Sequence, residues 1–146
     1  MSPEQLFGLS GSLAMPGWLI LAVSPLAPKW ANRIGGVFLP IVLCILYAAA
    51  VMAYWASGDG GFDSLANVML LFDTPGVATA GWIHFLAFDL AVGGWIVRQA
   101  RTSGVPHWMV LPCLFMTLMF GPVGLLMFLT IRFVREQLHA APSSTI

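Results

Sequence analysis

The chain has 146 residues, of which 59% are hydrophobic and only 8% are charged, and its mean hydropathy is +0.88. Soluble globular domains carry about a quarter charged residues, so this composition excludes an ordinary soluble domain and indicates an integral membrane protein. The six basic and six acidic residues cancel, which gives no reason to expect a nucleic-acid partner.

Four segments reach the length of about 20 mostly apolar residues that a membrane-spanning helix needs. They are residues 6–27, 34–56, 77–97 and 109–131. We therefore predict an all-α membrane protein, a four-transmembrane-helix bundle that forms a single domain over residues 1–139. We expect the tail over residues 140–146 to be disordered. Only Glu4 is charged ahead of the first segment, so we expect no signal or transit peptide.

The connection between the second and third predicted spans, SGDGGFDSLANVMLLFDTPG, contains three aspartates and a short apolar pattern. Asp63 is the predicted N-cap of a helix. The apolar positions fall at i, i+3, i+4 and i+7, and they are Phe62, Leu65, Ala66 and Met69. About ten residues are too few to cross a bilayer, so we predict a short interfacial or re-entrant helix over one end of the bundle.

Basic residues distinguish the two ends of the predicted bundle. Lys29 and Arg33 follow the first span, and Arg98 and Arg101 follow the third. The positive-inside rule places both of these connections in the cytoplasm and hence both termini outside it. Two arginines that follow the fourth span oppose this orientation.

The third predicted span contains GWIHFLAFDLAVGGWI, which places a histidine and an aspartate in an apolar stretch. Each residue advances about 100° around a helix. In this projection one arc of the helix extends from His84 to Asp89 and ends at Trp82. Its aromatic members are Trp82, Phe85, Phe88 and Trp95. Because a charged group that faces lipid costs at least a few kcal/mol, we predict that this aromatic arc faces the protein and that the opposite, aliphatic arc faces lipid. The two ionisable groups lie about 140° apart around the helix, so we expect them to border an aromatic slot without touching.

Depth in the membrane suggests partners for both groups. Asp89 should lie level with FGPVG, residues 120–124, where Pro122 leaves a backbone carbonyl without its donor. A protonated Asp89 can donate to this carbonyl or to a hydroxyl of Tyr47, Tyr54 or Thr117. His84 should lie level with the end of the fourth span, near Arg132.

Each candidate residue also has an ordinary structural explanation. An intramembrane carboxylate can hold two helices together, a histidine can bond a carbonyl near the interface, and aromatic residues at helical spacing usually pack in a core. The three histidines fall at different depths without an H-x₃-H spacing, so no metal site is predicted. No nucleotide motif is present either, and the cofactor stays unknown.

The stretch from Gly81 to Ile96, followed by GPVGLL, resembles the abscisic-acid-deficient-four-like family of membrane proteins, also called neoxanthin-synthase-like. The resemblance is clearest over residues 73–132. It rests on the W-x-H-x₄-D pattern and on the glycine–proline turn at residues 121–124. Plant members are tied to the conversion of violaxanthin to neoxanthin. For a chain without a transit peptide, the resemblance implies a protein of the bacterial inner membrane that takes a carotenoid or related isoprenoid.

The resemblance implies an enzyme that isomerises a carotenoid with epoxide opening, or one that cleaves a polyene such as β-carotene oxidatively. Asp89 would serve as acid or polar anchor, because a carboxyl in low-dielectric surroundings can stay protonated, and His84 would serve as base or orienting group. The implied substrate contacts are Trp82, Phe85, Phe88, Trp95 and Pro122. A non-enzymatic carotenoid- or lipid-binding accessory protein and a small transporter subunit are the alternatives. Expected partners are the polyene, membrane lipids, and a second copy of the chain or other carotenoid-pathway enzymes.

Overall fold

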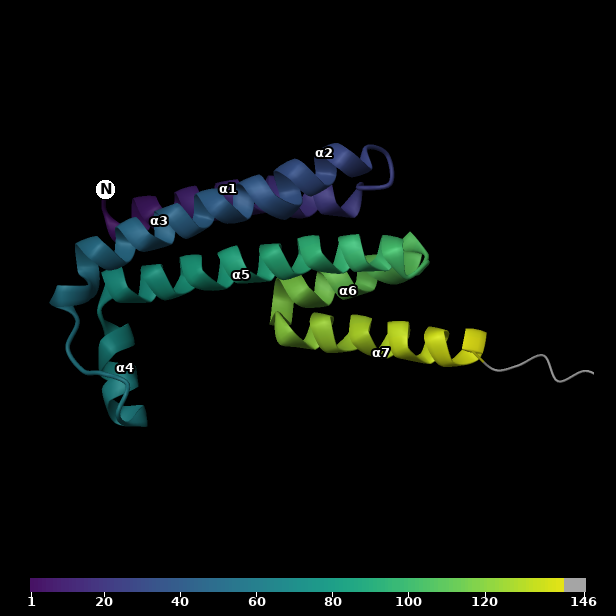
Figure 1. The fold of residues 1–146 in the computed structure, drawn as a ribbon. Coiled ribbons are helices and arrows are strands. Elements are labelled where there is room, and N and C mark those ends of the chain that lie inside the picture. The colour runs from purple at the N-terminus through teal and green to yellow at the C-terminus, as the bar shows by residue number, and fades with distance from the viewer. Residues whose placement is uncertain (141–146) are drawn as a thin grey trace, which may run out of the picture.

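The computed structural model describes residues 1–140, and this part of the chain is helical without any β-strand (Figure 1). The elements are α1 (Pro3–Ala22), α2 (Pro28–Arg33), a π-helical turn η1 (Ile34–Phe38), α3 (Leu39–Tyr54), a 3₁₀ turn η2 (Trp55–Ser57), α4 (Leu65–Asp73), α5 (Pro75–Thr102), α6 (His107–Phe120) and α7 (Pro122–Ala140). The stretch from α2 to η2 forms one long helix. Apart from Ala140, which ends α7, the tail expected to be disordered lies outside the described residues.

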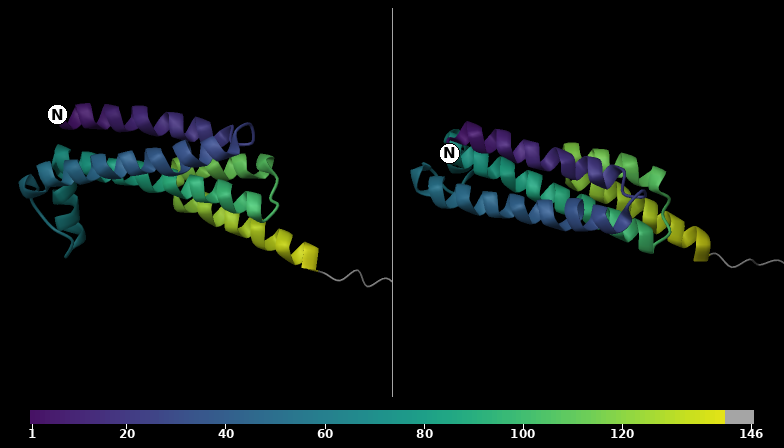
Figure 2. Two further views of the ribbon diagram at one scale, coloured as in Figure 1. Left: turned by 45° about the horizontal axis from the view of Figure 1, so that its top comes forward. Right: turned by 90° about the horizontal axis from the view of Figure 1, so that it is seen from above.

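Within residues 1–140, three helices are long and apolar enough to cross a membrane, and they agree with the first three predicted spans. They are Pro3–Ala22, Pro28–Ser57 and Pro75–Thr102, and they run side by side (Figures 1 and 2). A proline occupies the first turn of each, where its missing N–H leaves no helical bond unmade. In α1, Ser2 and Gln5 also exchange hydrogen bonds as a capping box, which fixes the start of the helix.

The fourth predicted span is not a single helix, so a four-span bundle is not confirmed. The chain reverses at Gly121, whose φ of +43° is a conformation that favours glycine. α6 and α7 then pack against each other and against the C-terminal half of α5 as an α6–α7 hairpin (Figures 1 and 2). With 14 residues, α6 is about 21 Å long, which is too short for a hydrocarbon core of about 30 Å.

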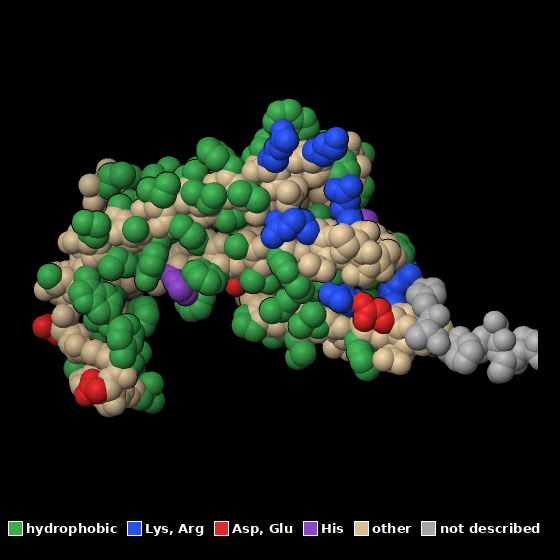
Figure 3. Space-filling model, viewed as in Figure 1, with side chains coloured by type: hydrophobic (Ala, Val, Ile, Leu, Met, Phe, Trp, Pro, Cys, Tyr) green, Lys and Arg blue, Asp and Glu red, His purple; other side chains and the backbone are tan. Residues whose placement is uncertain are grey.

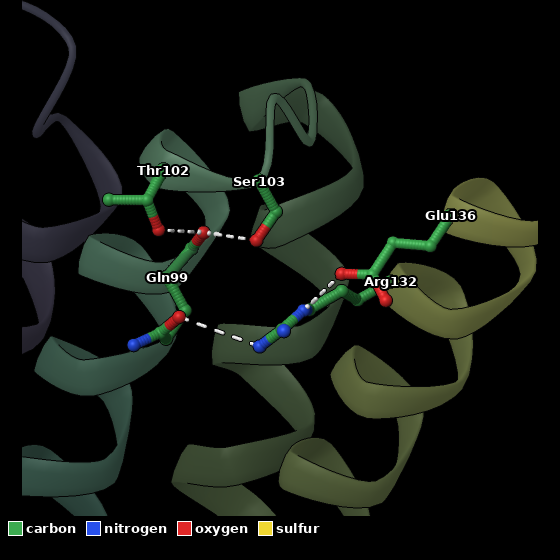
Figure 4. A network of polar contacts seen from close by, with 5 residues as sticks. All are labelled: Gln99, Thr102, Ser103, Arg132 and Glu136. Carbon is green, nitrogen blue, oxygen red and sulfur yellow. Dashed lines mark hydrogen bonds and ion pairs between the residues drawn. The ribbon is translucent and has the colours of Figure 1, made fainter. Parts of the chain in front are cut away.

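The α6–α7 hairpin gathers the positive charge at one end of the molecule. Figure 3 shows the Lys and Arg side chains over α2, the C-terminal end of α5 and the second half of α7. In Figure 4, Arg132 of α7 pairs with Glu136 at 2.7 Å, and its Nη1 donates to Gln99 of α5 at 3.5 Å. The two arginines of α7 therefore join the other basic residues.

The N-terminus and the end of α7 lie at opposite ends of the molecule (Figure 1). Both termini can lie on one side of a membrane only if the chain crosses it an even number of times. The expectation that both termini lie outside the cytoplasm therefore does not fit this layout.

The central helix α5 packs through the face that was predicted to meet lipid, so this prediction was wrong. Its buried residues include Ile83, Ala87, Leu90, Gly94 and Val97, whereas the side chains of Trp82, Phe85 and Phe88 are 44%, 60% and 58% exposed. Lipid solvates aliphatic and aromatic groups alike, so close packing of small residues selects the inner face of a membrane helix. A Cβ on Gly94 would lie only 2.6 Å from the Cα of Gly36 in η1. The two backbones thus meet directly.

The short helix predicted between the second and third spans is present as α4, at the end opposite the basic residues (Figure 1). Its N-cap is Ser64, whose Oγ accepts the Asn67 N–H at 3.2 Å, and not Asp63 as predicted. Asp63 instead accepts from the Asn67 side-chain amide at 2.9 Å, and this bond lowers the pKa of the Asp63 carboxyl. Leu71 is buried, while Leu65, on the predicted packing face, is 77% exposed.

Candidate functional site

A pocket of about 240 Å³ lies between α3, α4 and α5, at the acidic end of the molecule. Its walls are largely aromatic, and the rings that line it are Tyr47, Tyr54, Trp55, Phe62, Phe72, His84 and Phe85. Gly81 lets α4 approach α5 here, because a Cβ at this position would lie 2.6 Å from Cε1 of Phe72. The result is an apolar pocket of ring size with one imidazole in its wall.

The imidazole of His84 is half-buried among aromatic rings. Phe88, one turn further along α5, stacks on it with 4.6 Å between ring centroids. Tyr47 of α3 lies 5.3 Å away and Phe85 lies 6.1 Å away edge-on. Within residues 1–140 the imidazole forms no hydrogen bond, so one ring nitrogen can accept a proton from a bound molecule and the N–H of the other can donate to it.

Asp89 lies halfway along α5 and faces the turn between α6 and α7. Its Oδ1 would be 2.6 Å from a Cβ on Gly121, so glycine at this turn leaves room for the carboxylate. The expected match in depth between Asp89 and residues 120–124 is thereby confirmed. No hydrogen bond or ion pair joins Asp89 to His84 within the described residues, in agreement with two groups that do not touch.

Two of the three hydroxyls considered as partners of Asp89 donate to other groups. Tyr54 donates to the carbonyl of Met1 at 2.6 Å. Thr117 donates to the carbonyl of Cys113, one turn earlier in its own helix, at 2.8 Å. Tyr47 lies against the imidazole. Within the described residues the Asp89 carboxyl group forms no hydrogen bond with these hydroxyls.

Two of the four predicted aromatic contacts adjoin the imidazole, and two do not. Phe85 and Phe88 lie beside it. Trp82 instead stacks on Phe7 of α1 at 5.3 Å, and Trp95 packs edge-on against the buried Phe128 of α7 at 5.9 Å. The fifth predicted contact, Pro122, is exposed and begins α7 directly after the turn.

The prediction that His84 lies level with Arg132 is wrong. Arg132 reaches Gln99, which lies 15 residues along α5 from the histidine, or about 22 Å, because α7 returns to the basic end. The rings around the imidazole thus come from α3 and from α5 itself, and not from the fourth predicted span.

The aromatic face of α5 is open on one side of the molecule. Figure 3 shows a hollow on this face, between α4 and the α6–α7 hairpin. We call the surface formed by His84, Phe85, Phe88 and Asp89 of α5 the aromatic hollow. It lies about halfway along α5, which is one of the helices in the described chain that have the length and hydropathy of membrane spans.

Sequence reasoning missed that α3 and α4 complete the pocket. Tyr47 and Tyr54 stand seven residues apart, which places both on one face of a helix, and this spacing was the available signal. The sequence contains no comparable signal for Phe72, because no pattern within α4 shows which helix the Phe72 ring will contact. Among the described residues no three His, Cys, Asp or Glu side chains gather as metal ligands.

The apolar helices and the pocket together indicate a helical membrane protein with an aromatic site. The chain belongs to the ABA DEFICIENT 4-like (ABA4-like) family, whose model matches residues 5–128. The matched segment runs from the first turn of α1 into the first part of α7 and hence contains the whole aromatic hollow. The predicted family resemblance is confirmed, and membership associates the chain with the carotenoid and abscisic acid pathway to which the family belongs. No curated protein and no solved structure matches the chain.

Proposed function

We propose that the protein binds a carotenoid or related isoprenoid in the aromatic hollow and isomerises it. The observation that carries this proposal is the imidazole of His84, stacked on Phe88 at 4.6 Å in the wall of an aromatic pocket between helices of membrane-spanning length. A polyene dissolved in the membrane can enter such a site without crossing water. Aromatic faces also stabilise positive charge that develops on a neighbouring polyene.

The size of the pocket suggests how the ligand lies. Its volume of about 240 Å³ is below the roughly 300–1,000 Å³ of sites that enclose a drug-sized ligand. The pocket therefore suits one cyclic end group. An end group held at the mouth of this pocket, with its 5,6-epoxide between His84 and Asp89, leaves the remainder of the polyene along the open face of α5 across Phe88.

The two ionisable groups suit the opening of a 5,6-epoxide to an allene. Protonated Asp89 delivers its proton to the epoxide oxygen as the carbon–oxygen bond breaks. Neutral His84 takes a proton from the adjacent chain carbon, and the electrons of that carbon–hydrogen bond form the new double bond. Transfer of the proton from His84 back to Asp89 restores both groups, so the reaction is an isomerisation without net loss of atoms or electrons.

Turnover of a 5,6-epoxycarotenoid by purified protein in nanodiscs tests this proposal. Removal of a general acid or base typically costs 10²- to 10⁴-fold in rate, so we expect Asp89→Asn and His84→Ala to lose at least about a hundredfold while they still bind pigment. Asp73→Asn, which makes the same change on an exposed aspartate outside the hollow, should keep wild-type turnover. If both site variants turn over like wild type, the site assignment fails.

A carotenoid-binding protein without turnover is the second candidate. It is favoured by the absence of any bond between His84 and Asp89 in the described chain, because such groups can serve as separate polar anchors. Pigment that co-purifies with the wild type, is never converted, and is lost in both variants would support the binder over the enzyme.

We also propose that the basic end of the molecule faces the cytoplasm of a bacterial inner membrane, with the N-terminus outside. The clustering of Lys and Arg at one end supports this orientation (Figure 3). In a background without Cys44 and Cys113, a membrane-impermeant maleimide should label Ser2→Cys in intact cells. Gln137→Cys should react only after lysis. Four full spans would make both positions react from the same side.

A further inference from the structure

A second pocket, of about 490 Å³, lies between α2 and α5 at the basic end of the molecule. Three cationic side chains from two separate elements line it, namely Lys29 of α2 and Arg98 and Arg101 of α5. Pro28 and Val97 add an apolar side, and no acidic residue is among the lining residues. The aromatic hollow is formed elsewhere on α5, and the proposed function does not use this pocket.

The positive charge of this basic pocket is uncompensated in the described part of the chain. The ion pair found within residues 1–140 joins Arg132 to Glu136, outside the pocket. Neither Lys29 nor Arg101 forms a hydrogen bond in that part of the chain. Three like charges converge without a carboxylate between them, which favours an anion in the space that they surround.

Arg98 is held in place toward this pocket. Its Nη1 donates to Oδ1 of Asn32 at 2.9 Å and to the carbonyl of Gly36 at 3.4 Å. A Cβ on Gly36 would stand 3.1 Å from the same nitrogen, so glycine makes room for the guanidinium. One turn earlier on α5, Gly94 meets the backbone of Gly36. This crossing fixes α5 against the long helix and sets the position of the pocket.

The pocket lies at the end of the membrane-spanning helices, where a headgroup region would be. Trp30 on α2 is 62% exposed, and the guanidinium of Arg33 lies 5.9 Å from the centroid of its ring. Exposed tryptophan beside basic residues is typical of the membrane–water interface. Basic pockets between helices at this level bind anionic lipid headgroups.

We propose that this basic pocket binds the phosphate of an anionic phospholipid from the surrounding leaflet. The phosphate oxygens accept from Arg98, which is already oriented, and from Lys29 and Arg101, which have no other partner in the described chain. The glycerol and the first part of the acyl chains then pass along the apolar side formed by Pro28 and Val97.

Native mass spectrometry of the full chain in detergent tests this proposal. The protein is titrated with dioleoyl phosphatidylglycerol and, separately, with dioleoyl phosphatidylcholine. We expect tighter binding of the anionic lipid. Each cation near an anionic surface contributes about fivefold, so Lys29→Gln with Arg101→Gln should weaken phosphatidylglycerol binding about 25-fold. These two side chains form no bond in the described chain, so the fold should persist, as circular dichroism would verify.

A matched variant distinguishes lipid binding in the pocket from non-specific attraction of the lipid to the basic end of the molecule. Arg33→Gln with Arg135→Gln removes the same charge at the same end but from residues that do not line the pocket, so it should weaken phosphatidylglycerol binding clearly less than Lys29→Gln with Arg101→Gln does. Equal losses in the two double variants, or equal affinity for both lipids, would overturn the proposal. Displacement of the lipid by inorganic phosphate at equal concentration would show a free-anion site instead.

Discussion

Replacement of Gly94 by alanine tests the direct contact between α5 and the long helix. The new Cβ would lie 2.6 Å from the Cα of Gly36 and 3.0 Å from its carbonyl oxygen. Carbon atoms pack best at about 3.5–4.0 Å, so the two backbones must separate by about 1 Å. Neither obstacle is the end of a flexible side chain, and therefore the strain cannot be relieved by a change of rotamer.

The magnitude follows from two opposed effects. Overpacking costs about 1–3 kcal/mol, and a clash of backbone with backbone places this substitution near the upper limit. Alanine in a helix is favoured over glycine by about 1 kcal/mol. The net loss is about 2 kcal/mol, which lowers Tm by roughly 4–8 °C for a chain of this size.

Thermal unfolding in detergent, followed by circular dichroism, measures this effect. Gly11→Ala is the control, since a Cβ on Gly11 of α1 meets nothing within 4 Å. It should raise Tm by roughly 2–4 °C, because only the preference of alanine for the helix remains. A Gly94→Ala variant as stable as wild type would refute the argument that the backbones meet at this crossing.

Two further predictions concern the turn and α4. Gly121→Ala should lower Tm more than Gly104→Ala. Both glycines have positive φ, a conformation that costs other residues about 1–2 kcal/mol. Of the two new Cβ atoms, the one at residue 121 also meets the Asp89 carboxylate. Equal decreases in Tm would show that the carboxylate does not crowd the turn. Asn67→Ala should raise the pKa of Asp63 toward its ordinary value of 3.8 in a carboxyl NMR titration, since the Asn67 amide lowers it. Because the folded pKa is the lower one, this bond stabilises α4 at pH values above 3.8, and its contribution is lost as the pH falls through the lowered pKa. An unchanged Asp63 titration would contradict the assignment.

The sequence by itself determined the membrane class, three of the spans and the short helix that became α4. Length and hydropathy suffice for these features, because backbone groups in hydrocarbon must be satisfied within a helix and a span therefore needs a minimum apolar length. The same reasoning located His84 and Asp89 at different depths of one helix. It also placed Asp89 level with the glycine–proline turn, since depth follows from the rise per residue.

The fourth apolar run shows where this reasoning stops. Residues 109–131 have the length of a span, and only a local dihedral at Gly121 turns them into a hairpin. Average hydropathy over a window of residues does not detect a chain reversal at a single residue. The consequence is large, because the reversal moves the end of α7 and its arginines to the opposite end of the molecule.

Only the tertiary structure decided which face of α5 is packed and what surrounds His84. In lipid, both the aromatic and the aliphatic face are solvated, so hydrophobicity does not choose between them. The choice came from the fit of Gly94 against Gly36, a contact between helices more than fifty residues apart in the chain. That fit left the aromatic side of α5 open. Tyr47 of α3 then packed against the imidazole and Phe72 of α4 closed another side of the same pocket. This arrangement depends on packing between helices, which no periodicity within one helix encodes.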